Sequence, residues 1–210
     1  MPPNTLFKAT APLPAGRRVS TRARRLHRDP DTFKEQALAF EVKKPASWRF
    51  LPASWSPTAL LKRAPDFKDT LVRNAALPFC CAQGNHESRV HALPTFQACA
   101  RGALIHTPGL ASTVLQSLIS AIQGIHPTYE LIEASSRFEI AGCKAIYLRG
   151  AFSLITEPDG EPIEISCVSR SYVVFGPRAT FTLGLSSSSD PAYFSEVEFE
   201  HILRSLHISA

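Results

Sequence analysis

Between residues 129 and 186 the chain repeats one pattern, a strand-like apolar segment followed by a tight-turn signal, and this repeat restricts the fold more than any other feature. The turn signals are Ala141-Gly142, Glu157-Pro158-Asp159-Gly160 and Gly176-Pro177. The strand-like segments are 129–140, 143–155, 164–175 and 178–186. Because the connections are short, consecutive strands are expected to pair as antiparallel neighbours in a four-strand meander.

Two amphipathic segments, one on each side of this meander, predict helices. In the first, apolar residues recur with a period of 3.6 from a start near Ser112 or Pro108-Gly109 to a stop at Gly124 and Pro127. Its apolar positions are Val114, Leu115, Leu118, Ile119 and Ile122. The second begins with a capping box, Ser195 and Glu198. Its apolar stripe is Val197, Phe199, Ile202, Leu203 and Leu206. The predicted fold class is α+β, an antiparallel β-sheet meander with helices packed on its faces.

The region before the first helix predicts further strands. Residues 38–51 predict a strand, a Pro turn and a second short strand, in which Phe40 and Val42 alternate with charged neighbours. Residues 52–76 predict an irregular, Pro-rich excursion. Residues 77–82 and 95–105 predict two more strands, the latter with Phe96, Ala98, Ala100 and, at its end, Leu104 on one face. We therefore expect a single domain at 36–210, preceded by a basic, flexible arm at 1–35.

Positive charge is concentrated in the N-terminal third. Residues 1–73 hold 15 Lys and Arg against 6 Asp and Glu, whereas residues 74–210 hold 8 against 12. We expect residues 17–28 to contact an acidic surface of a protein partner, and nucleic acid is the less favoured partner. The candidate partner-binding residues of this arm are Arg17, Arg18, Arg22, Arg24 and Arg25. The alternatives are a solvated leader without a partner and an organelle transit segment, a type of segment rich in Arg and poor in acids.

Cysteine usage and hydropathy bear on the compartment. The chain has five cysteines, an odd number, and none of them is spaced C-x-x-C, which favours reduced thiols over a disulfide framework. No apolar run approaches the about 18 residues that suggest a membrane helix. We therefore expect a cytoplasmic protein without an integral membrane segment, with organelle targeting as the alternative. Adjacent Cys80 and Cys81 point to opposite faces of a strand, so at least one thiol could be accessible.

Chemically active side chains form no recognisable catalytic constellation. There is no G-x-S-x-G, phosphate-binding loop or dinucleotide fingerprint. His86 and His91 flank an H-E-x-x-x-H segment, one residue longer than the zinc-protease motif, so a metal site there is a minor hypothesis. Trp48 and Trp55 predict either an aromatic partner-binding patch or anchors in the core. We expect no enzyme activity and no cofactor.

Three segments together resemble the PsbP/DcrB-like superfamily, which includes LpqN, the Eag chaperones and Ran-binding Mog-type proteins. They are FEVKKPASW at 40–48, YELIEASSRFEIAGCKAIYLRG at 129–150 and FEHILRSLHI at 199–208. The resemblance implies an α/β/α sandwich and a binding, assembly or chaperone role rather than an active site. We expect the chain to differ from exported members in having no signal peptide or lipobox, and from the Eag chaperones in its arm and its 52–76 excursion.

Three functions follow as hypotheses. The leading one is a non-enzymatic binding or assembly protein with an unknown partner. The second is a chaperone for an apolar helix of a secreted or membrane client, which predicts an exposed apolar groove larger than a few hundred Å². The third is a metal-dependent hydrolase centred on His86 and His91.

Overall fold

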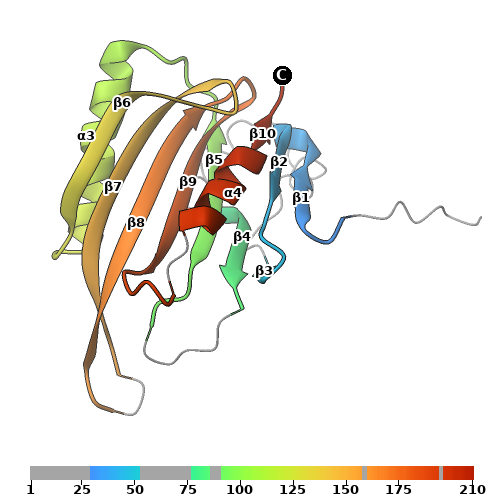
Figure 1. Ribbon diagram of the computed structural model, residues 1–210. Helices are drawn as coiled ribbons and strands as arrows, with labels where there is room; N and C mark the ends of the chain where they lie inside the picture. Colours follow the sequence, from blue (N-terminus) through green and yellow to red (C-terminus); the bar gives the residue numbers. More distant parts are fainter. Residues whose placement is uncertain (1–28, 53–76, 86–90, 158–159, 194–195) are drawn as a thin grey trace, which may run out of the picture.

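The computed structural model describes residues 29–52, 77–85, 91–157, 160–193 and 196–210, and these form two antiparallel sheets and two α-helices (Figure 1). The larger sheet has the strand order β3-β4-β5-β9-β8-β7-β6. Its strands are β3 (Trp48–Phe50), β4 (Pro78–Gly84), β5 (Thr95–Gly102), β6 (Glu130–Ile140), β7 (Cys143–Thr156), β8 (Ile163–Phe175) and β9 (Ala179–Ser188). The smaller sheet has the order β1-β2-β10, with β1 (Thr32–Glu35), β2 (Phe40–Lys43) and β10 (His207–Ile208). The helices are α3 (Pro108–Ile125) and α4 (Glu196–Ser205), and a short 3-10 helix (Gln36–Leu38) joins β1 to β2.

The predicted meander is confirmed. Strands β6 to β9 are consecutive antiparallel neighbours in the larger sheet. Ile140 pairs with Cys143, so the loop between β6 and β7 consists of Ala141 and Gly142 alone, with φ angles of 52° and 72°. Two consecutive positive φ angles are what a type I′ hairpin turn requires, because its backbone twist matches that of the flanking strands.

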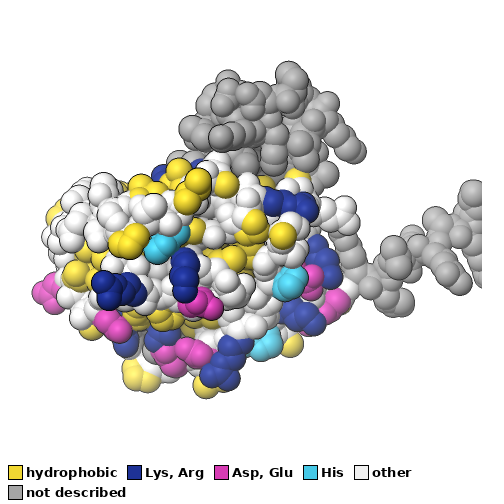
Figure 2. Space-filling model, turned by 90° about the horizontal axis from the view of Figure 1, so that it is seen from above, with side chains coloured by type: hydrophobic (Ala, Val, Ile, Leu, Met, Phe, Trp, Pro, Cys, Tyr) yellow, Lys and Arg dark blue, Asp and Glu magenta, His cyan; other side chains and the backbone are white. Residues whose placement is uncertain are grey.

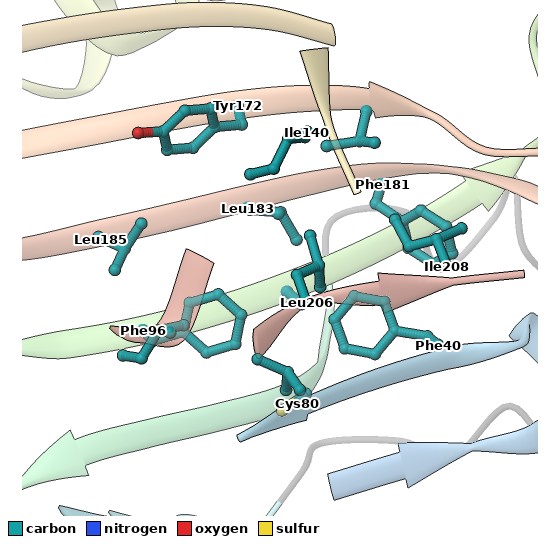
Figure 3. Packing of buried hydrophobic residues seen from close by; sticks show 14 of the residues in the cluster. Phe40, Cys80, Phe96, Ile140, Tyr172, Phe181, Leu183, Leu185, Leu206 and Ile208 are labelled. Atoms are coloured by element: carbon teal, nitrogen blue, oxygen red, sulfur yellow. The ribbon is translucent and has the colours of Figure 1, made fainter. Parts of the chain in front are cut away.

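The two helices lie on opposite faces of the larger sheet, which confirms the predicted α+β class (Figure 1). One face, here called the α4 face, packs against α4 and the smaller sheet. Its buried side chains form the main core, with Phe40, Cys80, Phe96, Phe181, Leu183, Leu185, Leu206 and Ile208 converging in Figure 3. The other face, here called the α3 face, packs against α3 through Ile146, Leu148, Val173 and Phe175. In the described part of the chain neither helix has the length and apolarity needed to span a membrane.

Three predictions need correction. The arm does not extend to residue 35, because Thr32–Glu35 is strand β1 and pairs with β2, so the domain begins before residue 36. Val197 is 78% exposed, because it lies on the side of α4 opposite Phe199 and Ile202. Leu104 lies beyond the end of β5 and packs against the α3 cluster.

One of the two residues of the predicted capping box is described. Ser195 lies outside the described residues. The carboxylate of its predicted partner, Glu198, accepts a hydrogen bond from the Ser47 hydroxyl at 2.8 Å, which ties α4 to the segment before β3.

Candidate functional site

A groove lies on the α3 face beside the C-terminal end of α3, where the helix leaves part of the sheet uncovered. Helix α3 contacts β6 and β7 most closely, while β5, β9 and the adjoining part of β8 extend beyond it. The groove has a volume of about 260 Å³. It is the candidate functional site of the described part of the chain.

The floor of the groove consists of two rows of small or polar side chains that cross the strands. In the first row Thr95 of β5 pairs with Ser186 of β9, and Ser186 pairs with Ser169 of β8. In the second row Gln97 pairs with Gly184, and Gly184 pairs with Ser171. Side chains two residues apart on a strand share a face, so both rows lie side by side on the α3 face. The floor therefore presents hydroxyl and amide groups.

The wall of the groove is apolar and aromatic. Ile122 and Ile125 project from the last turn of α3, and Ile125 is 73% exposed. His126, the C-cap of the helix, lies against Phe152 of β7 with ring centroids 4.2 Å apart. A ligand in the groove would thus meet hydrogen-bonding groups on one side and hydrocarbon on the other.

Gly184 has no side chain and therefore leaves space above the groove floor. A Cβ atom at this position would meet the Gln97 side chain at 3.4 Å, an ordinary van der Waals contact, so the site tolerates a side chain without strain. Glycine in a strand interior is otherwise unfavourable, and it often marks a place where a ligand or another backbone approaches closely.

The first row ends under a buried tyrosine. Ser169 pairs with Gly150 of β7, and the ring of Tyr129 lies directly on Gly150, where a Cβ atom would be 2.3 Å from Tyr129 Cζ. Tyr129 is 5% exposed, and its hydroxyl lies beside that of Ser169. Burial raises the pKa of Tyr129, and the contact with the Ser169 hydroxyl opposes this shift. A buried hydroxyl therefore adjoins the groove floor.

Titratable side chains are scarce in the described lining of the groove. No carboxylate, ammonium or guanidinium group is among the described side chains that line the groove, and His126 is the one titratable side chain there. General acid–base chemistry needs a titratable group in hydrogen-bond reach of a second reacting group, and nucleophilic chemistry needs an activated nucleophile. The groove shows neither pairing.

Trp48 and His91, the predicted site residues that are described, do not line this groove. Trp48 is 2% exposed and packs edge-on against Phe199 at 6.3 Å, so it is a core anchor and its assignment to a partner-binding patch is wrong. Residues Arg17, Arg18, Arg22, Arg24, Arg25, Trp55 and His86 lie outside the described residues.

His91 is the described half of the predicted metal pair. Its ring stacks on Tyr193 at 3.9 Å, and its Nδ1 lies 4.0 Å from Asp190 Oδ2. The described ranges contain no group of three or more His, Cys, Asp or Glu side chains that could hold a metal ion. The pair with His86 stays a prediction.

The five cysteines are all described and all free. Cys80 is buried in the main core and Cys81 is partly exposed, as their alternation along β4 predicts. Burial raises the pKa of both thiols, and that of Cys99 and Cys167 to about 11. Because the thiolate is the reactive form, these groups are poor nucleophiles at neutral pH.

A buried arginine on the α4 face contacts two half-exposed carboxylates of α4. Arg170 is 9% exposed and binds Glu196, and its second Nη lies 3.8 Å from Glu200 of the same helix. These contacts hold the first turn of α4 against β8.

Strand β6 is an exposed sheet edge, but it is poorly suited to pair with another strand. Leu131, Ile132 and Phe138 are all exposed on it. Two register shifts interrupt its pairing with β7, and the Ser135 hydroxyl accepts from the backbone N–H of Arg137 at 3.1 Å. Bulges and occupied backbone donors are devices that protect edge strands from aggregation.

Surface charge does not single out another site on the face shown in Figure 2. Seen from the end of the sheet where the C-terminus lies, Lys and Arg side chains are interspersed with Asp and Glu and with hydrophobic side chains. A concentrated field of one sign, which would steer a charged partner, is absent from the described side chains in this view.

The sequence contained a signal for the groove that sequence reasoning missed. Thr95 and Gln97 alternate with buried Phe96 and Ala98, and Ser169 and Ser171 alternate with buried Arg170 and Tyr172. This alternation shows that one face of each strand is polar. It does not show that the polar faces adjoin one another, which depends on β5 and β8 both pairing with β9.

Comparison with known proteins gives no family assignment. No family model matches the chain, and no curated protein matches it in sequence. Among solved structures it is similar to LpqN of Mycobacterium tuberculosis, involved in cell envelope biogenesis, at 18% identity over 81% of this chain and 83% of LpqN, with a TM-score of 0.49. A protein of Bacteroides thetaiotaomicron is similar at 9% identity over 86% of this chain and 48% of that one, with a TM-score of 0.40. These likenesses transfer neither a site nor an activity.

Proposed function

We propose that this chain is a non-enzymatic binding or assembly protein that holds a segment of a protein partner in the groove beside α3. The observation that carries the proposal is the groove itself, a hollow of about 260 Å³ whose described lining offers hydroxyl and amide groups opposite exposed hydrocarbon and no charged side chain. Ligand sites combine an apolar surface with a few placed polar groups in this way.

The lining of the groove does not match the chaperone hypothesis closely. That hypothesis predicts an exposed apolar groove for a client helix, whereas the floor of this groove consists of hydroxyl and amide groups. The chaperone function is therefore the second candidate.

The remaining parts of the proposal concern the scaffold and its surroundings. We take the domain to be a PsbP/DcrB-like scaffold, because its antiparallel meander, its helix on each face and its C-terminal helix followed by a short strand match the pattern expected for that superfamily. The free cysteines support a reducing compartment, so we place the protein in the cytoplasm. The basic residues 17–28 would add a second contact with an acidic surface of the same partner.

The test fills the groove without removing any contact. Gly184→Val places a β-branched side chain on the groove floor, where the backbone accepts a Cβ and where strand propensity favours valine. Thr182→Val is the matched control, because Thr182 lies on the same face of the same strand but outside the groove. Partners are cross-linked and purified with the intact chain from its native cell, identified by mass spectrometry and then titrated as purified proteins.

We expect a partner that binds the intact chain and the Thr182→Val control with equal affinity and binds Gly184→Val at least 10-fold more weakly. A partner that binds all three chains equally would show that the groove is not its site. Recovery of a product of chemical turnover from the intact chain would contradict the non-enzymatic assignment.

A further inference from the structure

We propose that Cys81 and Cys99 form a two-thiolate site for a soft monovalent metal ion of the Cu(I) type, on the part of the sheet that α3 leaves uncovered. The inference goes beyond the proposed function and does not depend on what the groove binds. Three observations carry it: the strand register that brings the two thiols together, the partial exposure of both, and the set of ligands that surrounds them.

The register of β4 and β5 places the two thiols next to each other on one face of the sheet. Cys81 pairs with Gln97, which lines the groove on the α3 face, and Cys99 is the next residue of β5 on that face. The two cysteines are therefore diagonal cross-strand neighbours, whose Cα atoms are usually about 7–8 Å apart. Their proximity is also evident in the pKa of Cys99, which burial raises to about 11 with a further contribution from Cys81.

Strand β4 is irregular immediately before this pair. The register shifts between Pro78 and Cys80, and both Phe79 and Cys80 are buried in the main core. The next residue, Cys81, points to the opposite face, where it is partly exposed, as is Cys99. Bulges re-aim side chains and are over-represented next to functional sites. The strand thus keeps the Cys80 thiol in the core and presents the Cys81 thiol beside Cys99, where a small ion can reach both.

The separation of the two cysteines suits a bridging ion better than a disulfide bond. A disulfide joins Cα atoms about 4.4–6.8 Å apart, which is less than the usual spacing of diagonal neighbours. An ion between the two sulfurs adds length, because two bonds of about 2.3 Å, the length of a zinc–thiolate bond, span sulfurs about 4.6 Å apart. Neither cysteine is in a disulfide in this structure. A metal bridge therefore requires less movement of the two strands than oxidation does.

The number and type of ligands favour Cu(I) over other thiophilic metals. Thiolates are soft ligands that bind Cu(I), zinc and iron–sulfur clusters. Structural zinc sites and iron–sulfur clusters each use four protein ligands. In the part of the chain that the structure describes, no third His, Cys, Asp or Glu joins the pair in a metal-binding group. Two thiolates satisfy a linear Cu(I) ion, and the two thiol protons leave to water as the ion binds, so no oxidant or reductant takes part.

The experiment titrates the full, reduced chain with Cu(I) alone, without oxygen, against a chromophoric Cu(I) chelator whose absorbance reports how much ion the protein removes. We expect one Cu(I) per chain, and X-ray absorption of the loaded protein should show two Cu–S bonds and no nitrogen ligand. Cys81→Ser and Cys99→Ser should each weaken binding at least about 10-fold, because a serine hydroxyl does not replace a thiolate. The double variant should resemble either single variant, since the two sulfurs act as one unit.

Cys143→Ser is the matched control. Cys143 is also partly exposed, but it lies at the start of β7, away from the pair. This variant should bind Cu(I) as tightly as the intact chain does. Zn(II) at the same concentration should not displace Cu(I], because two thiolates leave zinc short of its four ligands. Circular dichroism of each variant checks that it is folded before it is titrated.

Three outcomes would overturn the inference. Equal affinity of the intact chain and both single variants would place the ion elsewhere. A loss confined to one of the two variants, or a nitrogen ligand in the spectrum, would show that the two thiols do not act together. A reduced chain that binds no Cu(I) but forms a Cys81–Cys99 disulfide on treatment with diamide would show that the pair is a redox couple and not an ion site. The Gly184→Val titration decides the proposed function independently of these results.

Discussion

Substitution of Gly150 by alanine should destabilise the domain far more than a single methyl group usually does. A Cβ at this position would stand 2.3 Å from Tyr129 Cζ and 2.4 Å from its hydroxyl oxygen. Alanine cannot avoid these contacts, because the position of its Cβ is fixed by the backbone. The ring must move, and it is one of the buried side chains that hold α3 to the sheet.

The loss of stability depends on how far the Tyr129 ring is displaced. Overpacking that the core absorbs by small shifts costs about 1–3 kcal/mol. If the ring is expelled, the loss of the about 150–250 Å² that an aromatic side chain buries costs about 4–6 kcal/mol at 25 cal/mol per Å². We expect a value between these limits, about 3 kcal/mol, as a fall in the urea midpoint at unchanged slope.

A double-mutant cycle tests the reason for the effect. Tyr129→Ala alone should cost about 3–5 kcal/mol, the usual range for removing a buried aromatic ring. In that background Gly150→Ala should cost nothing or stabilise slightly, because the methyl group then meets open space and alanine is less flexible than glycine in the unfolded chain. Gly124→Ala in α3, where a Cβ meets no atom within 4 Å, is the control and should stabilise by about 0.5–1 kcal/mol. An equal cost of Gly150→Ala with and without the tyrosine ring would refute the reasoning.

Three further predictions concern other parts of the molecule. Arg170→Ala should cost about 1–3 kcal/mol in urea unfolding because it removes a buried side chain that contacts α4, whereas Glu196→Gln and Glu200→Gln should each cost less than about 1 kcal/mol because both carboxylates are half exposed; equal costs would show that the buried guanidinium is not what holds α4. A chain that begins at residue 35 should be about 2–4 kcal/mol less stable than one that begins at residue 29, because it loses most of β1 and Phe33, whose ring lies 5.9 Å from Phe50 and 6.0 Å from Phe79; equal thermal midpoints would contradict this. Burial raises the pKa of Cys167 from 9.0 to about 11, so the folded state keeps its proton after the unfolded state has lost it, and stability should fall as the pH rises from 9 to 11. Cys167→Ala should make this fall shallower, and identical pH profiles would exclude the thiol as a contributor.

Local patterns were sufficient for the meander and both α-helices, though not for β1. The alternation around Phe96 and Ala98, the period of 3.6 around Leu115 and the Ala141-Gly142 turn each predicted a strand, a helix or a hairpin that the structure contains. These features depend on neighbours within a few residues along the chain, so they can be predicted from the sequence alone. The prediction failed for Val197, an apolar residue on the exposed side of α4, because the surroundings decide which side of a helix is covered. For Trp48 the sequence left two roles open, and the burial of the side chain confirms the core anchor.

By itself, the sequence determined which side chains share a face of each strand and which strands follow one another in the meander, because both depend on the backbone period and on turn geometry. Only the tertiary structure decided that β9 lies between β5 and β8, so that their polar faces join into one floor, and that α3 leaves this floor uncovered. It also decided that Tyr129 lies on Gly150. The physical reason is that alternation shows which side chains share a face of a strand, but not which segment packs on that face. That packing depends on contacts between segments that are far apart in the sequence.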